Sequence, residues 1–420
     1  MQPAKEDKHD PYAAFRVPVY RKYVIGWFIA ALGTRIQSVA IGWEMYQRTG
    51  EALSLGLVGL MQAVPTMVLA LPSGYIADRF NRRNIAAISL VGMTITSFGL
   101  AALSYFQGPT PVMYGLLFLD ASFVIFGRPA RSALLPRIIP RAVFPNAITW
   151  NMSLMQIASV TGPAIGGFIL LWSVPAAYVA CACGSLVFIV WLLQIDFSED
   201  SEKPSEPASF RTVLAGIEFL WQKRVLLAII SLDLFAVLLG GAVYLLPIFA
   251  EDILKVGPTG FGWLNTAPAA GSFFMALLMT HLPPMRRAGH ILLWAVAGFG
   301  VATIGFGLST SFWLSIFMLF LTGALDNISM IIRHTLLQML TPDRMRGRVS
   351  AVSSVFIGAS NELGGLESGM MAHWFGSVFS VVSGGMGTII VVISMAVFSP
   401  SMRALGSLTE EAVGEKKEET

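Results

Sequence analysis

The chain has 420 residues, of which 55% are hydrophobic and 13% charged, and its mean hydropathy is +0.67. This composition is too apolar for an ordinary soluble protein, and a net charge of only +3 argues against a nucleic-acid partner. We therefore expect the chain to cross a lipid bilayer many times.

Apolar runs of about 20 residues, long enough to cross a bilayer as helices, follow one another along the chain. The first set is predicted at 23–47, 53–74, 84–106, 111–132, 145–172 and 174–195. The second set is predicted at 225–249, 259–282, 289–309, 312–337, 349–374 and 376–399. The predicted fold class is an all-α polytopic membrane protein with twelve transmembrane helices.

Polar segments separate and flank these two sets of helices. The segment between them is rich in Ser, Glu and Pro, a composition that cannot form a core, although 210–223 has the helical spacing of an interfacial helix. We expect five parts: an N-terminal segment 1–22, a six-helix half 23–195, a linker 196–224, a second half 225–399 and a tail 400–420.

The distribution of positive charge predicts the orientation in the membrane. Of the 28 Lys and Arg residues, only Arg48 and Lys255 fall in the loops predicted to be outside, and only Arg35 falls inside a helix. Because short cytoplasmic loops carry an excess of Lys and Arg, both termini are expected on the cytoplasmic side of a bacterial inner membrane.

The two halves carry an internal repeat. The segment 131–140 aligns with 333–342 and shares with it an Arg, a Leu-Leu pair and a Pro. A second match at nearly the same offset pairs Gly59 with Gly262, Gln62 with Asn265 and Pro65 with Pro268. The halves are thus predicted to be parallel repeats related by an axis along the membrane normal, with the binding site between them.

Charged residues inside the predicted helices mark candidate sites, because a charge at the centre of a bilayer costs about 2.5–3.5 kcal/mol on insertion scales. The candidates for substrate contact and proton coupling are Arg35, Asp120, Asp233, Asp326, Glu362 and Glu367. Burial favours a neutral carboxyl group and a nearby guanidinium favours the charged form, so such groups can exchange protons. Structural pairing between helices is the alternative interpretation.

The repeat also predicts how some of these residues are placed. Asp120 and Asp326 are expected at related depths on opposing halves, where they would frame one cavity. An Arg35–Asp233 bridge that forms and breaks is predicted as a switch. Glu44, near the end of the first helix, is expected at the outer surface.

The sequence predicts no metal, no organic cofactor and no enzyme site. The histidines do not cluster, and Cys181 and Cys183 are spaced so that they point to different faces of a helix. No nucleophile and base pair up within the bilayer, and no ATP-binding loop occurs. The expected energy source is therefore an ion gradient, most simply a proton gradient, or the gradient of the substrate itself.

Two short motifs resemble those of the major facilitator superfamily. The first is a basic turn between the second and third predicted helices, comprising Gly74, Asp78, Arg79, Arg82 and Arg83. It is similar to the superfamily loop whose acid and arginines latch the cytoplasmic gate, except that Asn81 stands where glycine is common. The second, in the fifth predicted helix, comprises Gly162, Pro163, Gly166 and Gly167. It resembles the Gly-Pro motif of superfamily antiporters, where small residues permit close helix packing.

A longer match runs from 325 to 350 and continues at 360–364. It resembles the superfamily branch that contains the enterobactin exporter and macrolide efflux proteins. The resemblance implies that Asp78 faces the eleventh helix with Arg346 or Arg348 nearby. It also implies proton-driven export of an amphipathic small molecule by alternating access.

These features predict a proton-coupled efflux transporter whose partners are a small-molecule substrate, protons and the lipid bilayer, and which acts as a monomer. An importer or facilitator with the same fold is the nearest alternative, because fold does not set the direction of transport. A membrane scaffold or sensor that transports nothing is a third hypothesis, and it would not require charges in a few helices.

Overall fold

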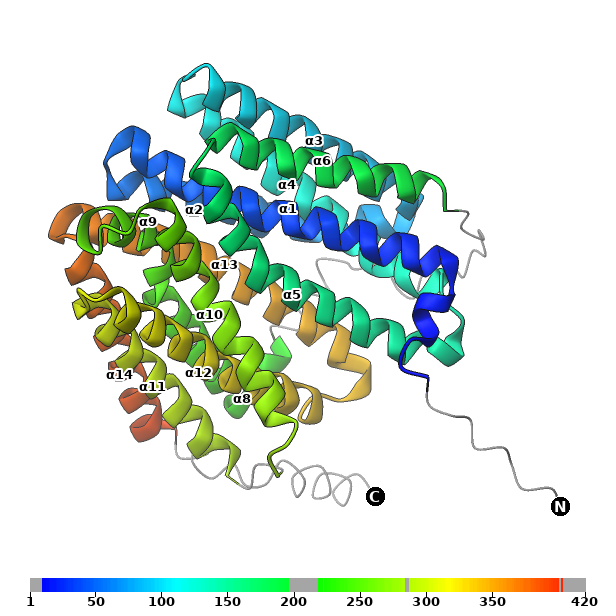
Figure 1. Cartoon of the computed structure of the whole chain (residues 1–420). Coiled ribbons are helices and arrows are strands. Elements are labelled where there is room, and N and C mark those ends of the chain that lie inside the picture. The colour runs from blue at the N-terminus through cyan, green and yellow to red at the C-terminus, as the bar shows by residue number, and fades with distance from the viewer. Residues whose placement is uncertain (1–9, 196–217, 222, 284–286, 400–401, 403–420) are drawn as a thin grey trace, which may run out of the picture.

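The computed structural model describes residues 10–195, 218–221, 223–283, 287–399 and Met402 (Figure 1). Every regular element in these ranges is a helix. Most of the predicted linker and tail lies outside the described residues. The predicted interfacial helix at 210–223 is described only near its end, where residues 218–221 are helical.

Six long helices form the first half. They are α1 (Pro18–Thr49), α2 (Ala52–Arg79), α3 (Arg82–Tyr105), α4 (Thr110–Leu134), α5 (Phe144–Leu170) and α6 (Val174–Leu193). Short 3₁₀ turns precede α1 and link α4 to α5, namely η1 (Ala13–Arg16), η2 (Leu135–Arg137) and η3 (Arg141–Val143). All six helices begin and end within a few residues of the predicted positions, except that α1 and α2 are about one turn longer at one end.

The second half repeats this pattern with one interrupted helix. Its regular helices are α10 (Gly257–Met279), α11 (Ala288–Leu308), α12 (Phe312–Met339), α13 (Asp343–Phe375) and α14 (Ser377–Phe398). The helix predicted at 225–249 is instead a succession of four short elements: α8 (Arg224–Leu239), η4 (Gly241–Leu245), α9 (Leu246–Ile248) and the π-helical η5 (Phe249–Ile253).

Close contact with α13 accompanies this interruption. A Cβ atom added at Gly241 would lie 2.4 Å from the carbonyl oxygen of Gly364 in α13. Only glycine permits such an approach, and Pro247, which has no N–H to donate, follows in the same region. The span predicted at 225–249 is present as Val225–Ile253, and its helix is interrupted where it contacts α13.

Ten segments of the described chain are long and apolar enough to cross a membrane, by length and composition. The other two of the twelve predicted helices, α10 and α13, are richer in small and polar residues. They pack against α5 and α2, respectively, in the opposite half. A helix with a large part of its surface packed against protein needs less apolar surface, which is consistent with their lower hydropathy.

The hydrophobic cores show where the halves meet. One core joins both halves and includes Trp43 and Leu55 from the first half with Phe249 and Phe261 from the second. Trp43 and Phe261 have their ring centroids 5.4 Å apart. The other cores belong to one half each, and the core of the first half surrounds Tyr20 near the start of α1. Among the described residues, the halves therefore share a core toward the α1–α2 turn and not toward the start of α1.

Glycines along α2 and α13 locate the point where the halves separate. At Gly59 an added Cβ would lie 2.8 Å from the carbonyl oxygen of Glu362, whereas at Gly74, further along α2, it would meet nothing within 4 Å. Gly347 in α13 is equally open. The two groups of helices accordingly diverge toward the end that carries the N-terminal segment (Figure 1).

Candidate functional site

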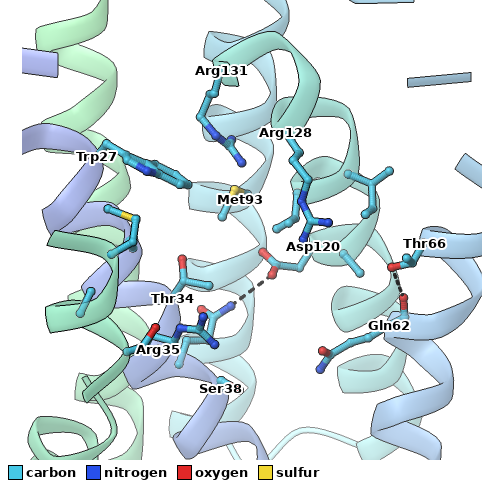
Figure 2. A pocket seen from close by; sticks show the side chains of 18 of the residues that line it. Trp27, Thr34, Arg35, Ser38, Gln62, Thr66, Met93, Asp120, Arg128 and Arg131 are labelled. Carbon is cyan, nitrogen blue, oxygen red and sulfur yellow. Dashed lines mark hydrogen bonds between the residues drawn. The ribbon is translucent and has the colours of Figure 1, made fainter. Parts of the chain in front are cut away.

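A cavity of about 610 Å³ lies in the first half and reaches toward the N-terminal end of the bundle. Its walls come mainly from α1, α2, α4 and α5, and α13 of the second half contributes Glu362. The charged side chains on its walls come from α1, α4 and α13, and Figure 2 shows those of α1 and α4. They are Arg35, Asp120, Arg128, Arg131 and Glu362. The volume falls in the range of drug-sized ligand sites.

Asp120 of α4 is held in the cavity wall by neutral donors. The Thr96 hydroxyl donates to its Oδ1 at 2.6 Å, and the Gln37 amide donates to its Oδ2 at 3.3 Å. Ser97 in turn donates to the Gln37 carbonyl oxygen at 2.7 Å. Asp120 is 9% exposed, and no described Lys, Arg or His forms a salt bridge with it. The site thus contains a largely buried carboxyl group whose charge has no paired cation.

Arg35 of α1 is exposed to the cavity, and a glycine in α5 makes room for it. A Cβ at Gly162 would lie 2.5 Å from the Cβ of Arg35. The guanidinium has neither a hydrogen bond nor an ion pair with the described residues. The first glycine of the predicted helix-packing motif therefore positions a charged residue of the cavity.

Arg128 and Arg131, both on α4, were not predicted as site residues. They stand near the end of an apolar run, where basic residues ordinarily mark the cytoplasmic side of a membrane protein. Arg131 is only 6% exposed, and its guanidinium carbon lies 4.5 Å from the centre of the Trp27 ring. Figure 2 shows both arginines directed into the cavity. The one sequence feature that singles out Arg131 is its alignment with Arg333 in the internal repeat.

In the second half, Asp233 and Arg333 form a buried ion pair between α8 and α12. The predicted Arg35–Asp233 bridge is therefore not formed in this conformation, because Asp233 already has a cationic partner within its own half. Arg333 and Arg131 occupy matching positions in the repeat. Only Arg333 has a carboxylate opposite it among the described residues.

Asp326 of α12 is exposed but does not line this cavity. The residue that matches Asp120 in the repeat is Thr322, which is buried and donates to the carbonyl oxygen of Leu319. Asp326 lies one helical turn further along. The expectation that Asp120 and Asp326 frame one cavity is thus not met by the cavity described above.

Of the two acids in α13, Glu362 lines the cavity and Glu367 does not. Glu362 accepts a hydrogen bond from the hydroxyl of Tyr244 in η4. Glu367 accepts one from Ser368 at 3.3 Å. Glu362 therefore brings a carboxyl group from the second half to a cavity that the first half otherwise forms.

The basic turn between α2 and α3 makes contacts within the turn and with the end of α6. Asp78 lies 3.8 Å from Arg82, and Arg83 donates to the carbonyl oxygen of Leu193 at the end of α6. Asn81 accepts from the backbone N–H groups of Arg83 and Asn84, at 2.9 and 3.3 Å. An N-cap of this kind satisfies free N–H groups at a helix start, which explains asparagine at this position.

The other proposed gate residues make contacts of their own. Arg79 donates to the hydroxyl of Tyr75 one turn earlier in α2. In α13, Arg346 donates to the carbonyl oxygens of Gln338 and Thr341, at 3.1 and 3.3 Å. Arg348 lies 3.9 Å from the sulfur of Met345. In this conformation Arg346 thus caps the end of α12.

The remaining residues of the α5 motif lie where helices touch. An added Cβ at Gly166 would be 3.4 Å from the Cα of Ile36 in α1, and one at Gly167 would be 2.6 Å from the Cα of Gly262 in α10. The carbonyl oxygen of Pro163 also borders Gly262. The motif thus brings α5 against a helix of each half.

Glu44 is buried rather than on the surface, which corrects the sequence-based expectation. It is 4% exposed, lies 2.6 Å from Arg48 and accepts a hydrogen bond from Tyr178 at 2.7 Å. Arg48 also donates to carbonyl oxygens at the end of α3, including that of Leu103 at 3.1 Å. Both charges are satisfied, so this cluster ties α1, α3 and α6 together.

Within the described residues, no three His, Cys, Asp or Glu side chains gather as a metal site would require. The two cysteines in this part of the chain are free; Cys181 is buried and Cys183 exposed. The cavity is therefore defined by its arginines, two carboxyl groups and neutral polar side chains.

In the described part of the chain, two repeated sets of helices enclose a cavity with charged side chains on its walls, and this is the fold of the major facilitator superfamily of transporters. A model of the transmembrane secretion effector family matches residues 9–416. The chain belongs to this family. Its family and its structural neighbours are transporters rather than enzymes.

The chain is similar to the enterobactin exporter EntS of Shigella dysenteriae and of Escherichia coli O81. Each is 24% identical over 388 residues, which cover 92% of this chain and 93% of the relative.

Two solved structures illustrate the likeness of fold. A bacterial homologue of the human lysosomal transporter Spinster, inward-facing and unoccupied, has a TM-score of 0.71 at 14% identity, with coverage of 96% of this chain and 98% of that one. A D-xylose–proton symporter has a TM-score of 0.66 at 14% identity, with coverage of 93% and 98%.

Proposed function

We propose that this transporter exports an amphipathic small molecule from the cytoplasm in exchange for protons. Asp120 is the observation that carries the proposal. A largely buried carboxyl group that faces a cavity and is held only by neutral donors can change its protonation without breaking an ion pair. Asp120 is thus the best candidate for the proton-carrying group of the first half.

The one-sided opening of the bundle supports alternating access. The halves share a core toward the α1–α2 turn and separate toward the N-terminal segment. In a transporter made of two repeats, the rocking of one half against the other exposes the site to each side in turn. The open end is the cytoplasmic one if the excess of Lys and Arg marks the cytoplasmic side.

Three observations favour export from that side. The cavity reaches the end where a cytoplasmic substrate would enter, the glycine motif of α5 resembles that of antiporters, and similar proteins are named as enterobactin exporters. Closure of the open end of the bundle is then the step that carries the substrate outward.

Proton movement in liposomes that contain the purified protein and a trapped pH-sensitive dye tests the proposal. A panel of siderophores and lipophilic drugs, enterobactin included, is added to one side. The wild-type protein should show proton flux evoked by at least one compound. Asp120→Asn should lower that flux at least tenfold while the protein remains folded.

Glu51→Gln is the matched control, because Glu51 is an exposed carboxylate at the α1–α2 turn, outside the cavity. It should behave as the wild type does. If a compound crosses the membrane without proton movement, proton coupling is refuted and a facilitator is the better description. If Asp120→Asn keeps full proton flux, Asp120 is not the coupling group.

A further inference from the structure

We propose that the cavity binds its substrate as an organic anion with an aromatic part, held by Arg131, Arg128 and Arg35. This inference rests on the proposed function and specifies the chemistry of the substrate. It follows from the arginines that line the cavity and from the absence of ion pairs between them and the described residues.

The cavity carries more positive than negative charge. Three of its lining residues are arginines and two are acids. Each acid has neutral hydrogen-bond donors, with Thr96 and Gln37 on Asp120 and Tyr244 on Glu362. None of the three arginines forms an ion pair with the described residues. Glu362 is close enough to Arg128 for an electrostatic interaction, so Arg35 and Arg131 are the guanidinium groups that have no carboxylate partner among the described residues.

Arg131 is the buried arginine of the cavity that has an unsatisfied hydrogen-bond donor. It is buried, and its Nη1 has no hydrogen-bond partner among the described residues. A buried charge is strongly unfavourable unless it is paired, and a guanidinium matches the geometry of a carboxylate or phosphate group. A ligand anion would supply the acceptor that this side chain lacks.

The internal repeat supports this interpretation through an asymmetry. Arg333, the counterpart of Arg131, is paired with Asp233 in α8. The position in α1 that matches Asp233, by the alignment that pairs Gly59 with Gly262, is Ala30. In the second half, Asp233 supplies the carboxylate that pairs with Arg333. In the first half, Arg131 has no such carboxylate and borders the cavity instead.

The surroundings of Arg131 indicate an aromatic ligand group. The Trp27 ring lies against the guanidinium, and Tyr23 and Met93 also line the cavity. Flat aromatic surface and a polarizable sulfur favour contact with a planar ring. A ligand could place its aromatic ring against Trp27 and its acidic group toward Arg131 and Arg128. It would then contact both the aromatic surface and the guanidinium groups of the cavity.

Binding of three compounds that share one ring tests the proposal. The probes are 2-naphthoate, 2-naphthamide and 2-naphthylmethylammonium, measured by calorimetry on the full-length protein in phosphatidylcholine nanodiscs. We expect 2-naphthoate to bind at least tenfold more tightly than the neutral and cationic probes. Arg131→Ala and Arg128→Ala should each weaken naphthoate binding at least fivefold, and Arg131→Lys should retain part of it.

Arg141→Ala is the matched control, since Arg141 is an exposed arginine in η3, at the same end of the bundle but outside the cavity. It should leave naphthoate binding unchanged. Arg128 is exposed to the cavity, so its alanine variant tests the proposal even if Arg131→Ala does not fold. The proposal would be overturned if the three probes bound equally well. It would also be overturned if neither Arg131→Ala nor Arg128→Ala weakened naphthoate binding.

A lipid headgroup is another source of anions. If phosphatidylglycerol in the nanodisc abolishes naphthoate binding and itself binds in an arginine-dependent way, the arginines hold lipid and the proposal fails. Binding needs no proton gradient, so it is independent of the proposed coupling. Arginine-dependent naphthoate binding without proton flux would refute the proposed function alone, and proton flux without anion preference would refute this inference alone.

Discussion

The guanidinium of Arg333 in α12 is paired with the carboxylate of Asp233 in α8, and both side chains are buried inside the second half. The pair joins the interrupted helix of this half to a long, continuous one. Arg131, its counterpart in the repeat, has Trp27 beside it instead of a carboxylate. Two arginines at matching positions of the repeat therefore have different partners, a carboxylate in the second half and an aromatic ring in the first.

We expect Asp233→Ala to destabilise the protein by about 3–5 kcal/mol, because it leaves the charge of Arg333 buried and unpaired. Thermal unfolding in detergent would measure this loss. The double variant Asp233→Leu with Arg333→Met removes both charges and should recover most of the stability. If the double variant is as unstable as the single one, the pair has a role beyond mutual neutralisation.

Gly167→Ala should destabilise the contact between α5 and α10 by about 1–3 kcal/mol. The added Cβ would lie 2.6 Å from the Cα of Gly262, so the two helices would have to move apart. Gly115→Ala in α4 is the control, because nothing lies within 4 Å of a Cβ there. Equal melting temperatures of the two variants would contradict the close contact across the halves.

Gly74→Cys should react with a membrane-impermeant maleimide in inside-out vesicles and not in intact cells, in a background where Cys181 and Cys183 are replaced by alanine. An added side chain at Gly74 meets open space at the end of the bundle predicted to be cytoplasmic. Glu51→Cys, at the opposite end, should show the reverse pattern. Labelling of Gly74→Cys in intact cells would invert the proposed orientation.

Tyr178→Phe should lower stability by about 1.5–3 kcal/mol, because the Tyr178 hydroxyl donates to the buried carboxylate of Glu44 at 2.7 Å. Tyr105→Phe is a suitable control, since Tyr105 is 73% exposed and its hydroxyl has no partner in the described part of the chain. Chemical or thermal unfolding would compare the two. A loss that is the same in both variants would show that the Glu44 hydrogen bond contributes little.

Most of the fold could be predicted, because a bilayer imposes one length and one composition on every helix that crosses it. The break after Leu239 could not, since it coincides with the contact of Gly241 with Gly364 in α13, more than a hundred residues away in sequence. Close contacts between distant segments leave no local pattern, so hydropathy shows an unbroken run there.

The candidate site was predictable to the extent that a charge stands out within an apolar run. Arg35, Asp120 and Glu362 were identified in this way, and all three line the cavity. Arg128 and Arg131 were missed because they stand at the end of an apolar run. Basic residues at such positions usually mark the cytoplasmic side of a membrane protein rather than a binding site.

The class of protein, its two repeated sets of helices and the charged residues within them could be predicted from the amino-acid sequence, because hydropathy, length and internal repetition are properties of the chain alone. Which of these charges are paired depends on how the helices pack. The rotation of each helix about its axis places Asp233 opposite Arg333, leaves Arg131 facing a cavity and keeps Asp326 off its wall. The rotation of each helix depends on its packing against helices that are far away in sequence. These helix–helix contacts therefore decide where a cavity lined by arginines can form.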